Sequence, residues 1–383
     1  MMKGINLHTY PSTFKHSSRI FKETKSLADS KLFEKIYIGA ILGDELPERE
    51  NIDDQREVWR VPLRLTRMPD GSLLKVFKII EWCFKLFFRF KKEGVEVAHC
   101  HGLSSLPIGI LLKWFSGSKV VYDAHELETE REGMSQLRRK LSKTAEKFFI
   151  RWIDSIVVVS NSIAKWYSSA YNFKDVYVVK NIPSHGKAES GDHRILRDRF
   201  DIGDDKLLFI YQGVIDHGRG IDLLLNVFSR TEKNRHIVFM GYGSYTERVK
   251  RYEAQVPNIH YQPAVGSEEI IHYTKSADVG IALIENTCLS YYYCLPNKLF
   301  EYLFSGIPPI VSDFPEMARI VDCYACGWKV EVEEEAVLGL INSISHDEIL
   351  EKRSKVLKCS DSFSWDNEVK TLRQMYERLQ RHR

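Results

Sequence analysis

Residues 295–313 read LPNKLFEYLFSGIPPIVSD, a stretch that combines the signals of a short helix and of a buried strand behind it. Pro296 suits the first turn of a helix, where its missing N–H costs no hydrogen bond, and Gly306 suits the left-handed residue that ends a helix. Between them, Lys298 and Glu301 are three positions apart and so share one helix face. The stretch therefore predicts a helix that carries a cation and a carboxylate near its start.

A helix start of this composition is suited to an anionic ligand. Its first amides lack intrahelical partners and the helix dipole favours negative charge, so phosphate binds there readily. Lys298 could balance the charge of a diphosphate while Glu301 accepts hydrogen bonds from the hydroxyls of a ribose. A surface helix with an i,i+3 ion pair is the plainer interpretation, and these two residues taken alone favour it.

Outside this stretch, short β-branched runs alternate with helical segments along the whole chain. This alternation is typical of βαβ units whose parallel sheets are covered on both faces. We therefore predict an α/β protein with two tandem, doubly wound, Rossmann-like domains. The predicted strands span residues 3–8, 35–42, 58–63, 95–100, 119–123, 155–159 and 176–179 in the first domain, and 207–211, 236–240, 258–261, 279–284, 308–311 and 328–332 in the second.

A chain-breaking segment at residues 181–186 separates the two sets of strands and predicts an interdomain linker. The N-terminal domain is expected at residues 1–182 and the C-terminal domain at residues 187–364. The closing helix, within residues 365–383, is expected to pack back on the N-terminal domain. Tandem domains of this kind bind their ligand where the carboxyl ends of the strands face each other across a cleft.

Charge and cysteine content narrow the function classes. Residues 1–180 carry +8 and the remainder carries −5, so one domain is expected to meet an anionic surface or substrate. The only CxxC pair, Cys323 and Cys326, lacks the second pair that a structural zinc site needs. The chain opens without a secretory signal, and no apolar run approaches the ~20 residues of a spanning helix. We therefore expect a cytoplasmic protein with reduced thiols.

Several further motifs occur in a fixed order along the chain. They are VAHCHG at 97–102, VYDAHE at 121–126, YQG at 211–213 with GRGIDLL at 218–224, VFMGYG at 238–243, SADVG at 276–280 and SW at 364–365. Together with residues 295–313 they resemble glycosyltransferase family 4, the retaining, nucleotide-sugar-dependent enzymes of the GT-B fold. The resemblance covers most of residues 3–380, and it implies two Rossmann-like domains facing a cleft.

Matched by position, the resemblance implies a set of site residues. Arg219 and Lys298 would hold the leaving diphosphate and act on the chemical step, and His101 would lie near the transferred sugar. The implied donor-binding residues are Arg219, Gly220, Gly241, Gly243, Glu285, Asn297, Lys298, Leu299 and Glu301. The residues implied for the acceptor side or the cleft are Ser17, Ser18, Arg19, His125 and Glu126. For a lone histidine, a satisfied polar residue at a strand end is the alternative.

Two positions depart from the family pattern. The family often has an acidic residue eight positions before the ribose-binding glutamate, and Tyr293 stands there in this chain. Glu285 is close enough in sequence to replace it. The arginine that commonly follows the glycine of the first C-domain strand is Val214 here. The phosphate clamp would therefore depend on Arg219 and Lys298 alone.

The predicted reaction moves a hexosyl or N-acetylhexosaminyl group from a UDP- or GDP-sugar to an acceptor hydroxyl, with retention of configuration. Fixed cations and helix amides at the developing charge could replace a divalent metal, so no metal or other cofactor is expected. The predicted acceptor is a lipid-linked glycan of bacterial surface polysaccharide, such as O-antigen or capsule. The alternatives are a sugar-nucleotide epimerase or phosphorylase on the same fold, or an inactive nucleotide-binding partner.

Two cationic helices suggest a partner for the N-terminal domain. Residues 73–92 carry a basic stripe that includes Lys75, Lys85 and Trp82, with several phenylalanines elsewhere around the helix, and residues 137–151 add a second basic run. Helices of this type can lie on an anionic membrane, here at the inner face of the plasma membrane. Equally, they could bury their apolar residues on the sheet and expose a solvated face. No nucleic-acid-binding module is recognised.

Overall fold

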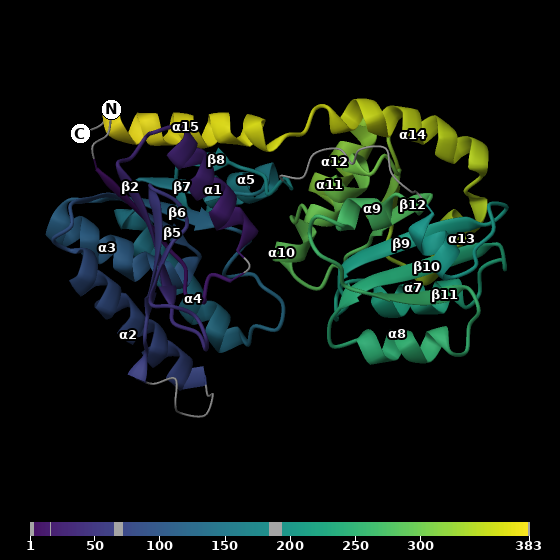
Figure 1. The fold of residues 1–383 in the computed structure, drawn as a ribbon, viewed down its shortest axis with the longest axis horizontal. Helices are drawn as coiled ribbons and strands as arrows, with labels where there is room; N and C mark the ends of the chain where they lie inside the picture. Colours follow the sequence, from purple (N-terminus) through teal and green to yellow (C-terminus); the bar gives the residue numbers. More distant parts are fainter. Residues whose placement is uncertain (1–3, 16, 65–71, 184–193, 382–383) are drawn as a thin grey trace. The chain divides into compact units, whose positions relative to one another are not determined.

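The chain folds into two units, each built around its own sheet (Figure 1). The computed structural model describes residues 4–15, 17–64, 72–183 and 194–381. Unit 1 comprises Met1–Lys180 and Asp366–Arg383, and unit 2 comprises Asn181–Trp365. The linker predicted at residues 181–186 lies partly outside the described residues.

The sheet of unit 1 has eight strands in the order β3-β4-β2-β1-β5-β6-β7-β8. Every neighbouring pair is parallel except β3 and β4, which are antiparallel. The strands are β1 (Ile5–Thr9), β2 (Lys35–Ile41), β3 (Arg49–Asn51), β4 (Arg56–Val61), β5 (Val95–His101), β6 (Lys119–Ala124), β7 (Ser155–Val158) and β8 (Val176–Val178). The seven predicted strands are confirmed within two residues, whereas β3 was missed because three polar residues show no strand pattern.

Helices cover both faces of this sheet, as its apolar strands require. They are α1 (Ser18–Asp29), α2 (Ser72–Phe90), α3 (Leu106–Ser116), α4 (Gln136–Phe149) and α5 (Asn161–Tyr171), with short 3₁₀ turns η2 (Leu103–Ser105) and η3 (Ile150–Trp152). Trp82, which the sequence placed on the basic stripe of its helix, is instead fully buried and donates its Nε1–H to the carbonyl of Ala40. Its large apolar ring gains more from burial than from exposure.

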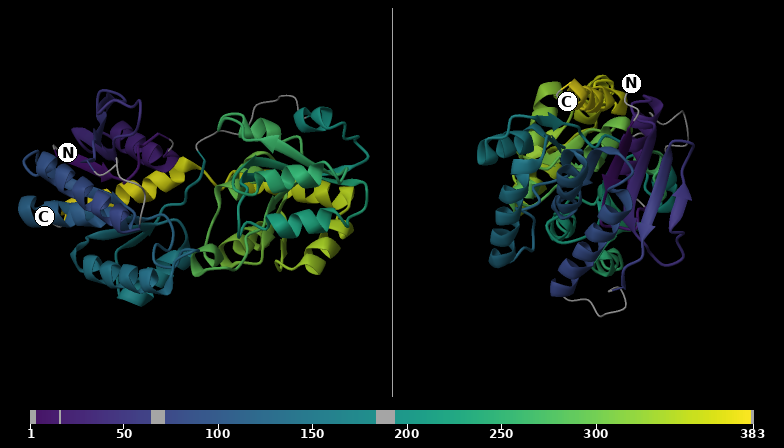
Figure 2. Two further views of the ribbon diagram at one scale, coloured as in Figure 1. Left: turned by 90° about the horizontal axis from the view of Figure 1, so that it is seen from below. Right: turned by 90° about the vertical axis from the view of Figure 1, so that its left-hand side faces the viewer.

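The C-terminal helix α15 (Trp365–Arg381) lies beside the N-terminal elements of unit 1, as Figures 1 and 2 show. Its amphipathic pattern buries Leu372, Met375 and Tyr376 completely. The ring of Tyr376 meets Phe33 edge to face, with the centroids 5.4 Å apart. The predicted return of this helix to the first domain is thereby confirmed.

The sheet of unit 2 has six parallel strands in the order β11-β10-β9-β12-β13-β14, the strand order of a Rossmann fold. The strands are β9 (Leu207–Val214), β10 (Arg235–Tyr242), β11 (Ile259–Pro263), β12 (Val279–Ala282), β13 (Pro309–Ser312) and β14 (Trp328–Val330). The helices are α6 (Ile195–Arg199), α7 (Ile221–Phe228), α8 (Thr246–Glu253), α9 (Ile270–Thr274), α10 (Leu289–Tyr292), α11 (Asn297–Phe304), α12 (Pro315–Tyr324), α13 (Glu334–Ser343) and α14 (His346–Ser360). The direction of winding reverses between β9 and β12, which is where such folds bind ligands.

Candidate functional site

Unit 2 contains a cavity of about 430 Å³ at the carboxyl ends of β9 and β10, beside the start of α11. One part of its wall is apolar and another part is charged. The lining residues are Tyr211, Gln212, Gly213, Val214, Arg219, Met240, Gly241, Tyr242, Ala264, Val265, Ile270, Pro296, Asn297, Lys298 and Glu301. The structure therefore brings Arg219, which is distant in sequence, into one wall with Asn297, Lys298 and Glu301 of α11.

Lys298 is the most unusual side chain of this cavity. It is only 8% exposed, and among the described residues its Nζ has no hydrogen-bond partner. The ammonium lies 3.6 Å from the centre of the Tyr211 ring, a cation–π contact. Burial holds the pKa of Lys298 well below its usual value, and the charge of Arg219 lowers it further, while Glu301 opposes the shift. An incoming anion would supply the partner that this lysine lacks.

Arg219 is carried by a turn that Glu285 holds in place. The Glu285 side chain accepts a hydrogen bond from the Gly220 amide at 3.2 Å, and its own amide donates to the Gly218 carbonyl at 3.0 Å. The guanidinium of Arg219 lies 4.6 Å from the centre of the Tyr291 ring. Glu285 does not line the cavity with Lys298, so its geometry is that of a support for the Arg219 turn.

Glu301 ends a chain of side-chain hydrogen bonds that the sequence did not reveal. Gln212 donates from Nε2 to Glu301 Oε2 at 2.6 Å, and the Thr274 hydroxyl donates to the amide oxygen of Gln212, also at 2.6 Å. This chain fixes the rotamer of Glu301 before any ligand arrives. The sequence placed Tyr211 and Gln212 in a family motif but assigned neither of them a role. Their position at the end of a predicted strand was the one sequence feature that could have marked them as site residues.

The glycines of the cavity are explained by close backbone approach. A Cβ on Gly241 would lie 1.8 Å from the Gly213 carbonyl oxygen, and one on Gly243 would lie 2.1 Å from that of Ile215. Gly241 lines the cavity, while Gly243 supports the strand ends behind it. Leu299, expected in the donor set, is fully buried in the core, and its amide donates to the Pro296 carbonyl at 3.1 Å. That amide is therefore already occupied.

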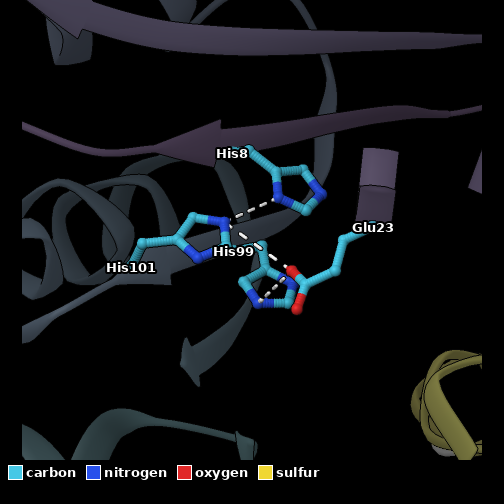
Figure 3. Close-up of side chains that lie close together, drawn as sticks. All are labelled: His8, Glu23, His99 and His101. Carbon is cyan, nitrogen blue, oxygen red and sulfur yellow. Dashed lines mark hydrogen bonds and ion pairs between the residues drawn. The ribbon is translucent and has the colours of Figure 1, made fainter. Parts of the chain in front are cut away.

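Unit 1 holds a second polar cluster, at the point where its winding reverses between β1 and β5. The rings of His8, His99 and His101 are stacked pairwise, and their centroids are 4.5 to 5.1 Å apart. Figure 3 shows Glu23 of α1 pointing toward the same group. All four side chains are completely buried. Of these residues, the sequence had proposed a site role only for His101.

The carboxylate of Asp123 determines which nitrogens of this cluster carry protons. It lies 3.0 Å from His101 Nδ1 and is ionised, because Arg19 and the neighbouring histidines hold its pKa well below the usual value against the effect of burial. Burial lowers the pKa of His101 to about 3, so the ring is neutral and Nδ1 is its protonated nitrogen. His101 Nε2 therefore accepts, and His8 Nδ1 donates to it at 2.8 Å.

His125 is the exposed end of this network. Its side chain is 27% exposed, and its Nε2 lies 3.2 Å from Asp123 Oδ2 and 3.0 Å from His101 Nδ1. Since His101 Nδ1 already carries a proton and Asp123 can only accept, His125 Nε2–H donates to the carboxylate. His101 has no exposed surface and both its nitrogens are engaged, so the structure does not place it where a substrate could reach it.

Arg19, which the sequence assigned to the acceptor side or the cleft, is part of the same network. Its guanidinium forms two hydrogen bonds with Asp123, at 2.9 and 3.0 Å, and donates to the Val179 carbonyl. It also pairs with Glu23 at 3.0 Å. Glu126 is half-exposed and pairs with Arg131 at 2.7 Å, while Ser17 precedes helix α1 and Ser18 is exposed in its first turn.

Three imidazoles and a carboxylate are also the donor set of many metal sites, and the ligand atoms of His8, Glu23, His99 and His101 lie within 4.8 Å of one another. The geometry favours a hydrogen-bonded network instead. His8 Nδ1 and His101 Nε2 are 2.8 Å apart, closer than the roughly 3.3 Å between two nitrogens of a tetrahedral zinc site. Arg19 pairs with Glu23 Oε1, while Oε2 faces His99 and His101.

These features define a class of protein: a two-unit α/β enzyme whose C-terminal Rossmann-like unit carries a cationic cavity at a helix start. Two family models match the chain in order, Glycosyltransferase Family 4 over residues 41–182 and Glycosyl transferases group 1 over residues 192–358. The chain belongs to the family 4 glycosyltransferases of the GT-B fold, as its sequence predicted.

Individual relatives are distant in sequence but similar in fold. A putative colanic acid biosynthesis glycosyl transferase of Escherichia coli is 21% identical over 325 residues, which cover 79% of this chain and 78% of that protein. Sucrose-phosphate synthase from Thermosynechococcus elongatus superposes with a TM-score of 0.80 at 14% identity, covering both chains completely. The Anabaena protein HepE, solved with UDP and glucose, gives a TM-score of 0.74 at 12% identity, over 98% of this chain and 99% of that one.

Proposed function

We propose that this glycosyltransferase takes its sugar from a nucleoside diphosphate sugar bound in the unit 2 cavity. The observation that carries the proposal is that Arg219, Lys298 and the start of α11 converge on one cavity wall, and that Lys298 Nζ has no hydrogen-bond partner in the part of the chain that the structure describes. Met240, Val265 and Ile270 supply an apolar part that suits a nucleobase. The HepE structure, which holds UDP and glucose, supports a donor of this class.

Within this site each polar group takes one part of the donor. Lys298 and Arg219 hold the diphosphate, and Glu301, held by Gln212, accepts hydrogen bonds from the ribose hydroxyls. As the glycosidic bond breaks, the diphosphate gains negative charge, and two fixed cations stabilise it without a divalent metal. Turnover is expected to survive treatment with a chelator. Configuration is retained at the anomeric carbon, as the family resemblance implies, and proton NMR of the product tests this.

On the N-terminal side, His125 is the histidine that meets the transferred sugar or the acceptor. Asp123 fixes its orientation and its protonation state, and His101 acts behind them as a positioning residue. This assignment replaces the sequence-based role of His101, because only His125 combines the network with exposed surface.

The acceptor is a lipid-linked glycan of bacterial surface polysaccharide, such as O-antigen or capsule, and the group moved is a hexosyl or N-acetylhexosaminyl unit. The printed role of the E. coli relative, in colanic acid biosynthesis, supports an acceptor of this class. The location that follows is the cytoplasmic face of the plasma membrane.

A panel of UDP- and GDP-sugars, with and without lipid-linked acceptor, tests the function. The proposal expects release of nucleoside diphosphate that depends on both donor and acceptor. A phosphorylase would instead release a sugar phosphate, and an epimerase would convert the donor without any acceptor. If calorimetry detected no binding of UDP or GDP, the glycosyltransferase, the phosphorylase and the epimerase would all be excluded. The protein would then have no donor-site activity.

A further inference from the structure

Unit 1 exposes a row of large apolar side chains that its sheet does not bury. On α2 they are Phe77, Ile80, Phe84 and Phe88, which are 57%, 43%, 50% and 61% exposed. Their spacing of three or four positions places them in one stripe along the helix. The opposite face of α2, with Trp82 and Leu86, packs inward and is fully buried. This helix is therefore apolar on two faces, and within the described residues only one of them packs against the sheet.

The stripe continues across the two neighbouring helices. Helix α3 contacts both α2 and α4, and α2 and α3 lie side by side in Figures 1 and 2. Phe115, at the end of α3, is 71% exposed and meets Phe87 with ring centroids 5.4 Å apart. Its neighbour Trp114 meets Trp152 of η3 edge to face at 5.2 Å. Phe87 is itself buried and meets the exposed Phe88 with centroids 5.4 Å apart, so aromatic contacts connect Phe88 of α2 with the end of α3.

Helix α4 completes this face with a stripe of its own. Leu137, Leu141 and Phe148 are 69%, 61% and 46% exposed, and they precede Trp152 at helical spacing. We name the outer apolar side chains of α2, α3, α4 and η3 the aromatic face. Its members are Phe77, Ile80, Phe84, Phe88, Trp114, Phe115, Leu137, Leu141, Phe148 and Trp152. Exposed apolar side chains gathered on neighbouring helices in this way mark an interaction surface.

Basic side chains surround the aromatic face. Residues 72–93 and 136–152 contain twelve Lys or Arg and only three Asp or Glu. One of the three, Glu146, is buried beneath the hydroxyls of Tyr122, Tyr167 and Tyr171 and contributes no surface charge. Arg139, Lys140, Lys143 and Lys147 also line a shallow hollow of about 340 Å³ on α4.

We propose that the aromatic face docks on an anionic lipid surface. Aromatic and leucine side chains enter the interfacial layer of a bilayer while Lys and Arg bind the lipid headgroups. A second copy of this chain fits less well, because apposing two such faces would bring their positive charges together. Among the described residues, none of the helices combines the length and apolar character needed to span a bilayer. None of the residues of the aromatic face lines the donor cavity, so this membrane proposal does not depend on the proposed function.

Vesicle flotation with the full chain tests this proposal. We expect binding to phosphatidylcholine vesicles that contain phosphatidylglycerol, little binding to pure phosphatidylcholine, and release by added salt. Replacing Arg138, Lys140 and Lys147 with Gln should lower partitioning by about a hundredfold, at roughly fivefold for each basic side chain. Replacing Phe84, Phe88 and Phe115 with Ser should lower it at least about tenfold.

Matched variants of unit 2 provide the controls. Lys233, Arg251 and Lys358 are exposed and are replaced with Gln, and Leu350 and Leu357, 62% and 56% exposed, are replaced with Ser. Both controls should bind vesicles like the parent protein. All variants should keep their circular dichroism and their UDP affinity, so that loss of vesicle binding is separated from unfolding and from failure of the donor site.

Three outcomes would overturn the proposal. The parent protein could fail to bind anionic vesicles at low salt, the face variants could bind as well as the controls, or neutral vesicles could bind equally well. A concentration-dependent dimer that the Phe84, Phe88 and Phe115 substitutions abolish, without any vesicle binding, would instead identify a second copy as the occupant.

Discussion

Replacing Lys298 with Met should stabilise the unliganded protein and, at the same time, weaken donor binding. The lysine is buried, has no hydrogen-bond partner among the described residues, and has its pKa lowered well below the usual value by burial and by Arg219. A buried polar group without a partner costs about 1–3 kcal/mol, which an apolar side chain of similar length recovers. If Lys298 served only to stabilise the fold, its replacement with Met would instead lower the free energy of unfolding.

The loss of binding follows from the same geometry. A charge-assisted hydrogen bond to a diphosphate contributes about 1.5–3 kcal/mol, so the affinity for UDP should fall by roughly 10- to 150-fold. Binding should also take up a proton, because a bound diphosphate raises the pKa of Lys298. Affinity is then greatest below the pKa of the free protein and declines as the pH rises toward the higher pKa of the complex.

Urea unfolding and isothermal titration calorimetry in buffers of different ionisation enthalpy measure the two effects. Lys233→Met, at an exposed site of the same unit, serves as the control and should change neither quantity. The reasoning is refuted if Lys298→Met lowers the free energy of unfolding while UDP affinity and proton uptake stay unchanged.

The remaining predictions concern other parts of the two units. Gly241→Ala should destabilise the protein by more than about 3 kcal/mol, because its Cβ would lie 1.8 Å from the Gly213 oxygen. Gly339→Ala in α13, where a Cβ meets no atom within 4 Å, should stabilise the protein by about 0.5–1 kcal/mol. Thermal unfolding of the two variants measures both changes. Glu301→Gln should weaken UDP binding by about 1–2 kcal/mol but not proton uptake, and equal affinities in calorimetry would contradict the ribose assignment. The free energy of unfolding should fall as the pH is lowered from 6.5 toward about 3, because the unfolded chain protonates His101 and the folded one does not. Burial raises the pKa of Glu23 from 4.5 to about 8, so the contribution of Glu23 to the free energy of unfolding should decline as the pH rises across that interval, opposing the gain from His101 below pH 6.5 and dominating above it. A urea series on Glu23→Gln should show the decline between pH 6.5 and 8 removed, and an unaltered profile would count against it.

Some of the site could be predicted from the sequence because it depends on local signals. Pro296 and Gly306 mark the two ends of helix α11 in any environment that allows a helix. Lys298 and Glu301, three positions apart within it, therefore had to share one helix face, whether exposed or buried. The alternation of apolar runs with helical segments likewise predicted the parallel sheets, because strands covered on both faces consist almost entirely of apolar residues. Arg219 was predicted as a site residue from the motif at residues 218–224, and the fold places it in the same cavity as Lys298.

Contacts between distant residues could not be read in this way. Nothing near His101 in the sequence shows that His8 donates to one of its nitrogens and that Asp123 accepts from the other, which removes it from reach of a substrate. Nor does the α2 sequence show which of its phenylalanines the sheet buries. Phe87 and Phe88 are adjacent, yet the first is 6% and the second 61% exposed, because the orientation of a helix on its sheet selects the buried face.

The sequence by itself therefore determined the two Rossmann-like units, the returning C-terminal helix and the family, all of which follow from periodicity and short motifs. Only the tertiary structure decided which polar residues are buried against one another, which aromatic side chains of the three helices stay exposed, and that Lys298 lacks a hydrogen-bond partner among the described residues. Burial and pairing depend on the packing of elements that are distant in the chain, and no local pattern encodes that packing.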